Sequence, residues 1–204
     1  MNSLNNIRNL RQEIAVQAAK LLAADGAMDY SAAKQKAMKL CGVAGRVDLP
    51  SNEEIEAELK IHLNTFDLGE RAVLLRKKRE AALAAMQLLQ EFEPMLVGTV
   101  LEGTAVENSP IELQLFSDSV KDIAVYLIEK NIPYEPFDRK MRINKNESVD
   151  VPTFRVNYGE HEIYLSVLAH KMRRQKLFSP ITLQPMSRAS IKKVKALLVG
   201  NDAT

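Results

Sequence analysis

Hydrophobic positions in the first 93 residues recur at every third or fourth residue, which is the spacing of helices with one buried face. This spacing predicts helices over residues 4–24 and 31–40, another from residue 51, and a longer one over residues 70–92. The third begins at Ser51-Asn-Glu-Glu54, a capping box in which the serine accepts a bond from the amide three residues on and Glu54 reaches back. Pro94 ends the fourth. We therefore expect a helical bundle.

The period changes after Pro94. Residues 110–116 alternate, with Ile111, Leu113 and Leu115 on one face, which predicts a strand, and residues 96–101 predict another. A helix is expected from residue 117 or 118 to about residue 131. Further strands are expected over residues 133–137, 140–143, 151–156 and 162–168, then an irregular stretch to residue 187 and a last helix to residue 199. Short turns at residues 144–146 and 157–159 favour antiparallel pairing.

These elements predict an α+β protein: an N-terminal helical bundle followed by a mostly antiparallel sheet with flanking helices. The change of period places a boundary between a helical region, 1–93, and an α+β region, 94–204. The composition, 46% hydrophobic and 26% charged, is that of a globular protein.

Targeting and redox signals are missing from the sequence. The start has no basic stretch followed by an apolar one, and no apolar run reaches the roughly 18 residues that a membrane helix needs. Cys41 is the single cysteine, so no internal disulfide or cysteine-built zinc site forms, and we expect it to be a small buried apolar residue. A cytoplasmic protein with no membrane partner is predicted.

The charge of the chain is concentrated near its end. The net charge is only +2, but residues 169–204 hold eight basic residues against Asp202 alone. Within this region, Lys171, Arg173 and Arg174 belong to the basic segment His170–Lys176, which we interpret as a candidate phosphate-binding segment. The alternative is a solvated loop that offsets acidic residues earlier in the chain. Because Phe178 is the one aromatic residue beside the segment, stacking on RNA bases is not expected.

One constellation carries possible chemistry. Gly103-Thr104 follows a predicted strand, and Ser109 and Glu112 accompany the next one. This arrangement resembles the nucleotidyltransferase superfamily with the DNA-polymerase-beta-like fold, and the whole chain is similar to uncharacterised bacterial proteins placed near that superfamily. In the family, Gly-Ser cradles the nucleotide phosphates, and two carboxylates at alternate positions of the following strand, with a third from a later strand, hold two metal ions.

The resemblance implies a role for each matching residue. Gly103, Thr104 and Ser109 would bind a nucleotide, Glu112 would be the catalytic carboxylate, and Glu112 and Glu162 would hold metal. Pro110 occupies the first carboxylate position, and its side chain has no metal-binding oxygen. The resemblance therefore implies that two-metal catalysis is lost or mostly lost, with Mg²⁺ as cofactor only if transferase activity survives, and that a nucleotide or RNA phosphate is the partner.

The same residues also fit purely structural roles, and a non-enzymatic function is open as well. Gly103 would serve a turn and Glu112 would be a solvent-facing strand residue; the basic run Arg76–Arg79 would be a solvated helix face paired with Glu70 and Glu80. A second function class is a non-enzymatic interaction module whose helical half docks a protein partner or a second copy of the chain. The phosphate loop GxxxxGK[ST], GxSxG, GxGxxG and HExxH are absent from the sequence.

Overall fold

Two compact units make up the computed structural model, which describes residues 2–25, 28–43, 48–65, 68–144, 146–175, 177–179 and 183–200. Unit 1 comprises Met1–Ala72 with Val106–Asn108, and unit 2 comprises Val73–Ala105 with Ser109–Thr204. The division therefore falls inside a long helix, whereas the sequence suggested a boundary at residue 93. Among the described residues, no helix is long and apolar enough to cross a membrane.

Unit 1 is helical, as predicted. It contains α1 (Asn2–Ala24), α2 (Tyr30–Leu40), α3 (Asn52–Thr65) and the first residues of α4 (Leu68–Leu88). The three complete helices share a core in which small residues allow close approach; its buried members include Ile14, Ala18, Leu22, Ala33, Ala37, Ile55, Leu59 and Leu63. Cys41, at the end of α2, is partly buried against this core, and burial raises the pKa of its thiol.

The predicted capping box starts α3. The amide of Glu54 donates to Ser51 Oγ at 3.1 Å, and the amide of Ser51 donates to Glu54 Oε2 at 2.5 Å. The same carboxylate accepts from Arg11 Nη2 of α1 at 2.7 Å, and this hydrogen bond lowers the pKa of Glu54. The cap thus also ties α1 to α3.

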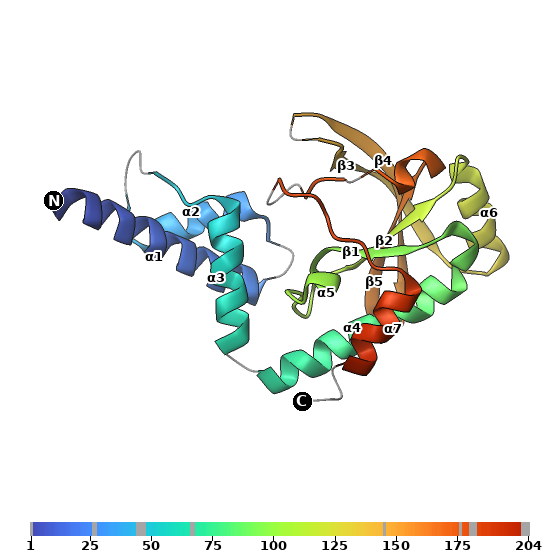
Figure 1. Cartoon of the computed structure of the whole chain (residues 1–204), viewed down its shortest axis with the longest axis horizontal. Coiled ribbons are helices and arrows are strands. Elements are labelled where there is room, and N and C mark those ends of the chain that lie inside the picture. Colours follow the sequence, from blue (N-terminus) through green and yellow to red (C-terminus); the bar gives the residue numbers. More distant parts are fainter. Residues whose placement is uncertain are drawn as a thin grey trace. The chain divides into compact units, whose positions relative to one another are not determined.

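Unit 2 is built on a five-stranded sheet with the order β1-β2-β5-β4-β3 (Figure 1). The strands are β1 (Met95–Val97), β2 (Ile111–Phe116), β3 (Tyr134–Arg142), β4 (Ser148–Tyr158) and β5 (His161–Leu168). Three of the four pairings are antiparallel, and β2 runs parallel to β5. The prediction of an α+β protein with a mostly antiparallel sheet is therefore confirmed.

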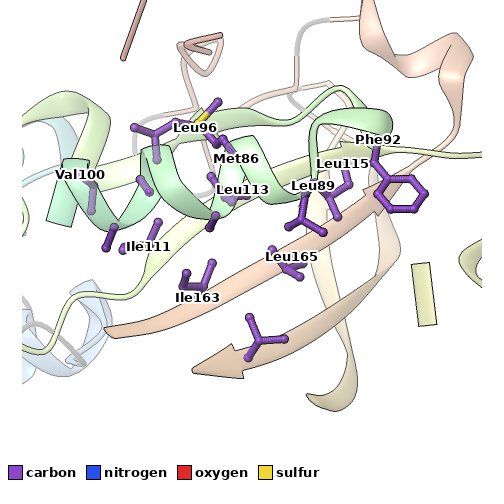
Figure 2. Close-up of a cluster of buried hydrophobic side chains, with 14 of the residues drawn as sticks. Met86, Leu89, Phe92, Leu96, Val100, Ile111, Leu113, Leu115, Ile163 and Leu165 are labelled. Atoms are coloured by element: carbon purple, nitrogen blue, oxygen red, sulfur yellow. The ribbon is translucent and has the colours of Figure 1, made fainter. Parts of the chain in front are cut away.

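Helices cover one face of the sheet. Alternate residues of β2 and β5 point to this face and pack against α4, against the 3₁₀ turn η1 (Gln90–Phe92), and against α6 (Val120–Glu129) and α7 (Ile191–Gly200). Figure 2 shows Met86, Leu89 and Phe92 facing the strand residues Leu113, Leu115 and Leu165. Because α4 buries its apolar side here from about residue 75 onward, most of that helix belongs with the sheet.

Three predicted elements needed correction. The strand predicted over residues 96–101 ends at Val97, because Gly98 has a φ of +71° and turns the chain into the short helix α5 (Gly98–Glu102). The two strands predicted over 133–137 and 140–143 are one strand, β3, whose charged residues are tolerated because it is a sheet edge. The last helix, α7, begins at Ile191, later than predicted.

The end of the chain covers part of the opposite face. After β5 comes the 3₁₀ turn η2 (His170–Arg173), and the following residues bring Leu177, which is 0% exposed, onto a second small core with Phe116, Val151 and Leu168. The segment after β5 therefore covers the apolar end of this face.

We predict that Leu113→Ala lowers the free energy of unfolding by about 2 to 5 kcal/mol, because Leu113 is 1% exposed and its removal leaves a cavity under α4. Ile128→Ala on α6 is the control, since Ile128 is 62% exposed and its truncation should change stability by about 0.5 kcal/mol or less. Urea unfolding followed by circular dichroism measures both. Equal losses would contradict the packing of β2 beneath α4.

Candidate functional site

Polar side chains gather on the face of the sheet that no helix covers. Because strand residues alternate, burial of Ile111, Leu113 and Leu115 directs Glu112 and Gln114 to this face. On β5, Tyr164 lies beside Glu112 and Ser166 lies beside Gln114. The face therefore carries a polar stripe across the central strands.

Glu112 is held in an ion pair from the far edge of the sheet. Arg139 Nη1, on β3, donates to Glu112 Oε2 at 2.6 Å, and the guanidinium passes 5.7 Å from the centre of the Tyr164 ring. The Glu112 side chain is 15% exposed and the Arg139 side chain is 30% exposed. On its other side the carboxylate covers Gly98, where an added Cβ would lie 3.0 Å from Glu112 Cδ. Arg139 thus neutralises the one acidic side chain of β2.

Glu162, the second predicted metal ligand, lies on the same face of the neighbouring strand, two residues before Tyr164. Its carboxylate is 3.5 Å from Arg155 Nε, and Arg155 also bonds Glu135 at 3.1 Å. Each predicted ligand therefore has an arginine of its own. Among the described residues no group of three or more His, Cys, Asp or Glu side chains is arranged to hold a metal ion. A metal site at Glu112 and Glu162 stays a prediction that this geometry does not favour.

Tyr164 lies between these ion pairs. Burial, together with the neighbouring Glu162 carboxylate, raises the pKa of its hydroxyl above the ordinary value. Its ring meets Phe137 of β3 edge-on at a centroid distance of 5.3 Å. The aromatic pair and the arginines over it make this part of the face a closed network of contacts.

The predicted phosphate cradle is placed differently from the expectation. Gly103 is the residue after α5, with a φ of +79°, and the amide of Thr104 donates to Thr99 O at 2.9 Å. The pair therefore ends a helix instead of following a strand. Thr104 is 4% exposed, and its hydroxyl has no hydrogen-bond partner within the described part of the chain. Ser109 is also buried, and its carbonyl accepts from Lys78 Nζ at 2.8 Å.

Two buried cations of α4 lie beneath this loop. Lys78 and Arg79 are 3% and 7% exposed, so the prediction that Arg76–Arg79 is a solvated helix face is wrong for these two; it is right for Arg76, which pairs with Glu80 at 3.0 Å. Arg79 Nε donates to Val100 O at 3.2 Å, and Arg79 Nη2 lies 3.7 Å from where a Cβ of Gly103 would be. Burial lowers the pKa of Arg79.

The basic segment is fixed at the other end of β2. The amide of His170 donates to Asp118 Oδ1 at 3.1 Å, and Arg173 Nη1 lies 2.5 Å from Glu93 Oε2. Lys171 and Arg174 are exposed and, within the part of the chain that the structure describes, make no ion pair; Lys176 lies outside that part. The four-residue step along β2 from Glu112 to the Phe116 end is about 13 Å. The predicted site residues thus form two groups.

Three residues of the site were not identified from the sequence. Of the three, only Gly98 has a sequence signal for a turn at the end of a strand: it directly follows the apolar run Met95–Val97 and precedes Thr99. Arg139 reaches Glu112 from a strand that is three positions away in the sheet order, and Arg79 lies on a helix. No sequence spacing indicates either contact.

Comparisons with known proteins add a weak structural likeness. No protein-family model and no curated protein matches the chain. Among solved structures, the Cid1 poly(U) polymerase is similar in two forms: a mutant bound to MgATP, with 18% identity, and the MgGTP-bound protein, with 19% identity. Each match has a TM-score of 0.33 and covers 46% of this chain and 32% of that one. The chain therefore spans about a third of the polymerase.

Both matches are to a poly(U) polymerase, and at a TM-score of 0.33 they establish neither a substrate nor an activity for this chain.

We predict that Arg139→Met destabilises the protein by about 1 to 3 kcal/mol, because it leaves the Glu112 carboxylate half-enclosed beside Gly98 without its partner. The control is Arg155→Met on the same face, where the guanidinium is 42% exposed and its two carboxylate partners are 74% and 42% exposed. That change should cost about 1 kcal/mol or less. Urea unfolding measures the stability of both variants. An equal loss of stability in the two would contradict a stabilising role for the ion pair between Glu112 and Arg139.

Proposed function

We propose that the chain is a nucleotidyltransferase-like protein with impaired two-metal catalysis that binds the phosphate of a nucleotide or RNA at the Gly103-Thr104 loop. The observation that carries the proposal is Arg79. Its buried guanidinium makes one hydrogen bond within the described residues, to the neutral carbonyl of Val100, and lies against Gly103. A buried cation without a carboxylate partner favours a bound anion.

Thr104 supports the same ligand. Its buried hydroxyl, which has no partner among the described residues, can donate to a phosphate oxygen, and hydrogen bonds to charged groups are among the stronger ones in proteins. Gly103 adds no side chain between the guanidinium and the loop surface. Lys171 and Arg174, at the far end of β2, are exposed cations that a longer polyanion such as RNA would reach.

The impairment of catalysis rests on the carboxylates. Pro110 stands where the family has the first metal ligand, and Glu112 is neutralised by Arg139 at 2.6 Å. Glu162 is engaged by Arg155. A two-metal site needs clustered carboxylates that are free to bind metal, and this face pairs them with arginines.

The test is a thermal-shift titration with ATP, CTP, GTP and UTP, each with and without Mg²⁺ or Mn²⁺. A nucleotide that binds the native state raises the melting temperature, and we expect the same rise with and without metal. Thr104→Val should weaken binding by about tenfold, because it removes one hydrogen bond to a charged group and keeps the side-chain volume. Glu112→Gln should leave the shift unchanged.

Thr99→Val is the matched control, since it makes the same chemical change at the start of α5. Loss of binding in Thr99→Val and not in Thr104→Val would move the phosphate site to Gly98-Thr99. A shift that requires metal and disappears in Glu112→Gln would overturn the impairment of catalysis. No shift with any nucleotide at millimolar concentration would overturn nucleotide binding.

A second candidate function is a non-enzymatic interaction module in the helical half. It is favoured by large apolar side chains on the surface of unit 1: Leu40, Leu49 and Ile61 are 65%, 37% and 57% exposed. If this surface binds a second copy, light scattering should show a concentration-dependent dimer that Leu40→Lys dissociates. Val125→Lys, at an exposed apolar position on α6, is the control and should leave the dimer intact. A monomer at all concentrations would exclude self-association.

A further inference from the structure

Gln114 and Arg188 meet on the face of the sheet opposite to α4, beneath the basic turn η2. Arg188 Nε donates to Gln114 Oε1 at 2.7 Å, and Arg188 Nη1 donates to Arg173 O at 2.8 Å and, more weakly, to Met172 O at 3.4 Å. Gln114 is 0% exposed, in the middle of β2. The arginine thus links the turn to the central strand.

The hydrogen-bond donors of this pair exceed the acceptors available to them. A guanidinium has five N–H groups, and an amide nitrogen has two. Arg188 Nη2 and Gln114 Nε2 are both buried, and neither has a hydrogen-bond partner among the residues that the structure describes. Each is bonded to the same carbon as an atom of the 2.7 Å hydrogen bond, so the two nitrogens lie on one small patch. Both groups lacking a partner here are donors, so the missing group is an acceptor.

The positive charge of Arg188 also favours an anionic ligand. Among the described residues, Arg188 donates to one amide oxygen and two backbone carbonyls, all of them neutral, and no carboxylate pairs with it. Burial lowers the pKa of the guanidinium. The ring of Phe116, 5.5 Å from the guanidinium carbon, provides partial compensation through its π face, but it accepts no conventional hydrogen bond from Nη2.

The polar neighbours of Gln114 do not supply the acceptor in this arrangement. Ser166, opposite Gln114 on β5, is 2% exposed and lies 3.2 Å from the hydroxyl of Thr153, which itself donates to Val151 O at 3.0 Å. Because the Thr153 proton is used on Val151, Ser166 is the donor in that pair. Both hydroxyl protons are thus used, and within the described residues Gln114 Nε2 donates to neither oxygen.

We propose that Arg188 Nη2 and Gln114 Nε2 form a binding site for a small oxyanion, a carboxylate or phosphate group, distinct from the Gly103-Thr104 loop. One oxygen-bearing anion would accept from both nitrogens and offset the charge of Arg188. Because both donors lie below the surface, the anion must be small or must be the terminal group of a larger molecule. Binding would also fix η2, since Arg188 holds its carbonyls.

The decisive variant is Gln114→Glu, which keeps the side-chain shape and supplies the missing acceptor within the protein. Its second carboxylate oxygen would accept from Arg188 Nη2 and complete a two-bond pair. The probes are inorganic phosphate and acetate at low millimolar concentration, against chloride at matched ionic strength. The readout is the melting temperature of the full chain. Low concentrations matter because phosphate at high concentration stabilises folded proteins in general.

We expect phosphate or acetate to raise the melting temperature of the unaltered protein. The anion that gives the larger rise indicates whether the site prefers a phosphate or a carboxylate group. Gln114→Glu should melt higher than the unaltered protein in chloride and should lose the anion-dependent rise. Arg188→Lys, which keeps the charge but lacks the second nitrogen, should also lose the rise. Arg76→Lys, the same change at an exposed arginine of α4 that pairs with Glu80, should retain it.

An anion-dependent rise that persists in Gln114→Glu overturns the proposal, because the anion then binds elsewhere. Equal behaviour of the unaltered protein in phosphate, acetate and chloride also overturns it, and it would mean that water or nothing occupies the patch. Thr104→Val separates this site from the proposed nucleotide site. It should leave the phosphate or acetate shift unchanged while weakening the nucleotide shift, and the reverse pattern is expected for Gln114→Glu.

Discussion

The burial of one face of β2 and β5 beneath α4 is the constraint on which the rest of unit 2 depends. Ile111, Leu113 and Leu115 are at most 1% exposed, and their counterparts on β5 are similarly buried. Since side chains alternate along a strand, this burial leaves Glu112 and Gln114 no choice of face. A one-residue shift of β2 would bury a carboxylate among leucines, so the hydrophobic packing fixes the face on which Glu112 and Gln114 lie.

The alternation of β2 is the part of the site that the sequence predicts well. Ile111, Leu113 and Leu115 were identified as one face, and the capping box at Ser51 and Glu54 forms as expected, because both signals are local. Local signals also gave the helical first half and the antiparallel hairpins. The strand predicted to Leu101 failed at Gly98, where a positive φ starts a helix that apolar residues alone do not indicate.

The remaining errors concern contacts between distant parts of the chain. Lys78 and Arg79 look like surface residues in a basic run, but both are buried, and α5 and the loop that follows it supply carbonyl acceptors at Val100 and Ser109. Arg139 and Glu112 are 27 residues apart and meet only because β3 and β2 belong to one sheet. The sequence does not reveal these contacts, because a buried arginine that donates to a carbonyl and a solvated arginine are the same residue type.

The pairing of charges on unit 2 separates two kinds of arginine. Arg139 and Arg155 bind carboxylates, so their charges are balanced within the protein and they close the face where metal ions would bind. Arg79 and Arg188 bind neutral groups. Arg79 lies against Gly103, whose neighbour in sequence, Thr104, has a buried hydroxyl without a partner among the described residues, and the same is true of Gln114 Nε2 beside Arg188. A buried positive charge next to an unused donor is stabilised by an anion and by little else. The two proposed anion sites therefore use residues other than the carboxylates of β2 and β5, so the proposed phosphate binding does not depend on metal binding at Glu112.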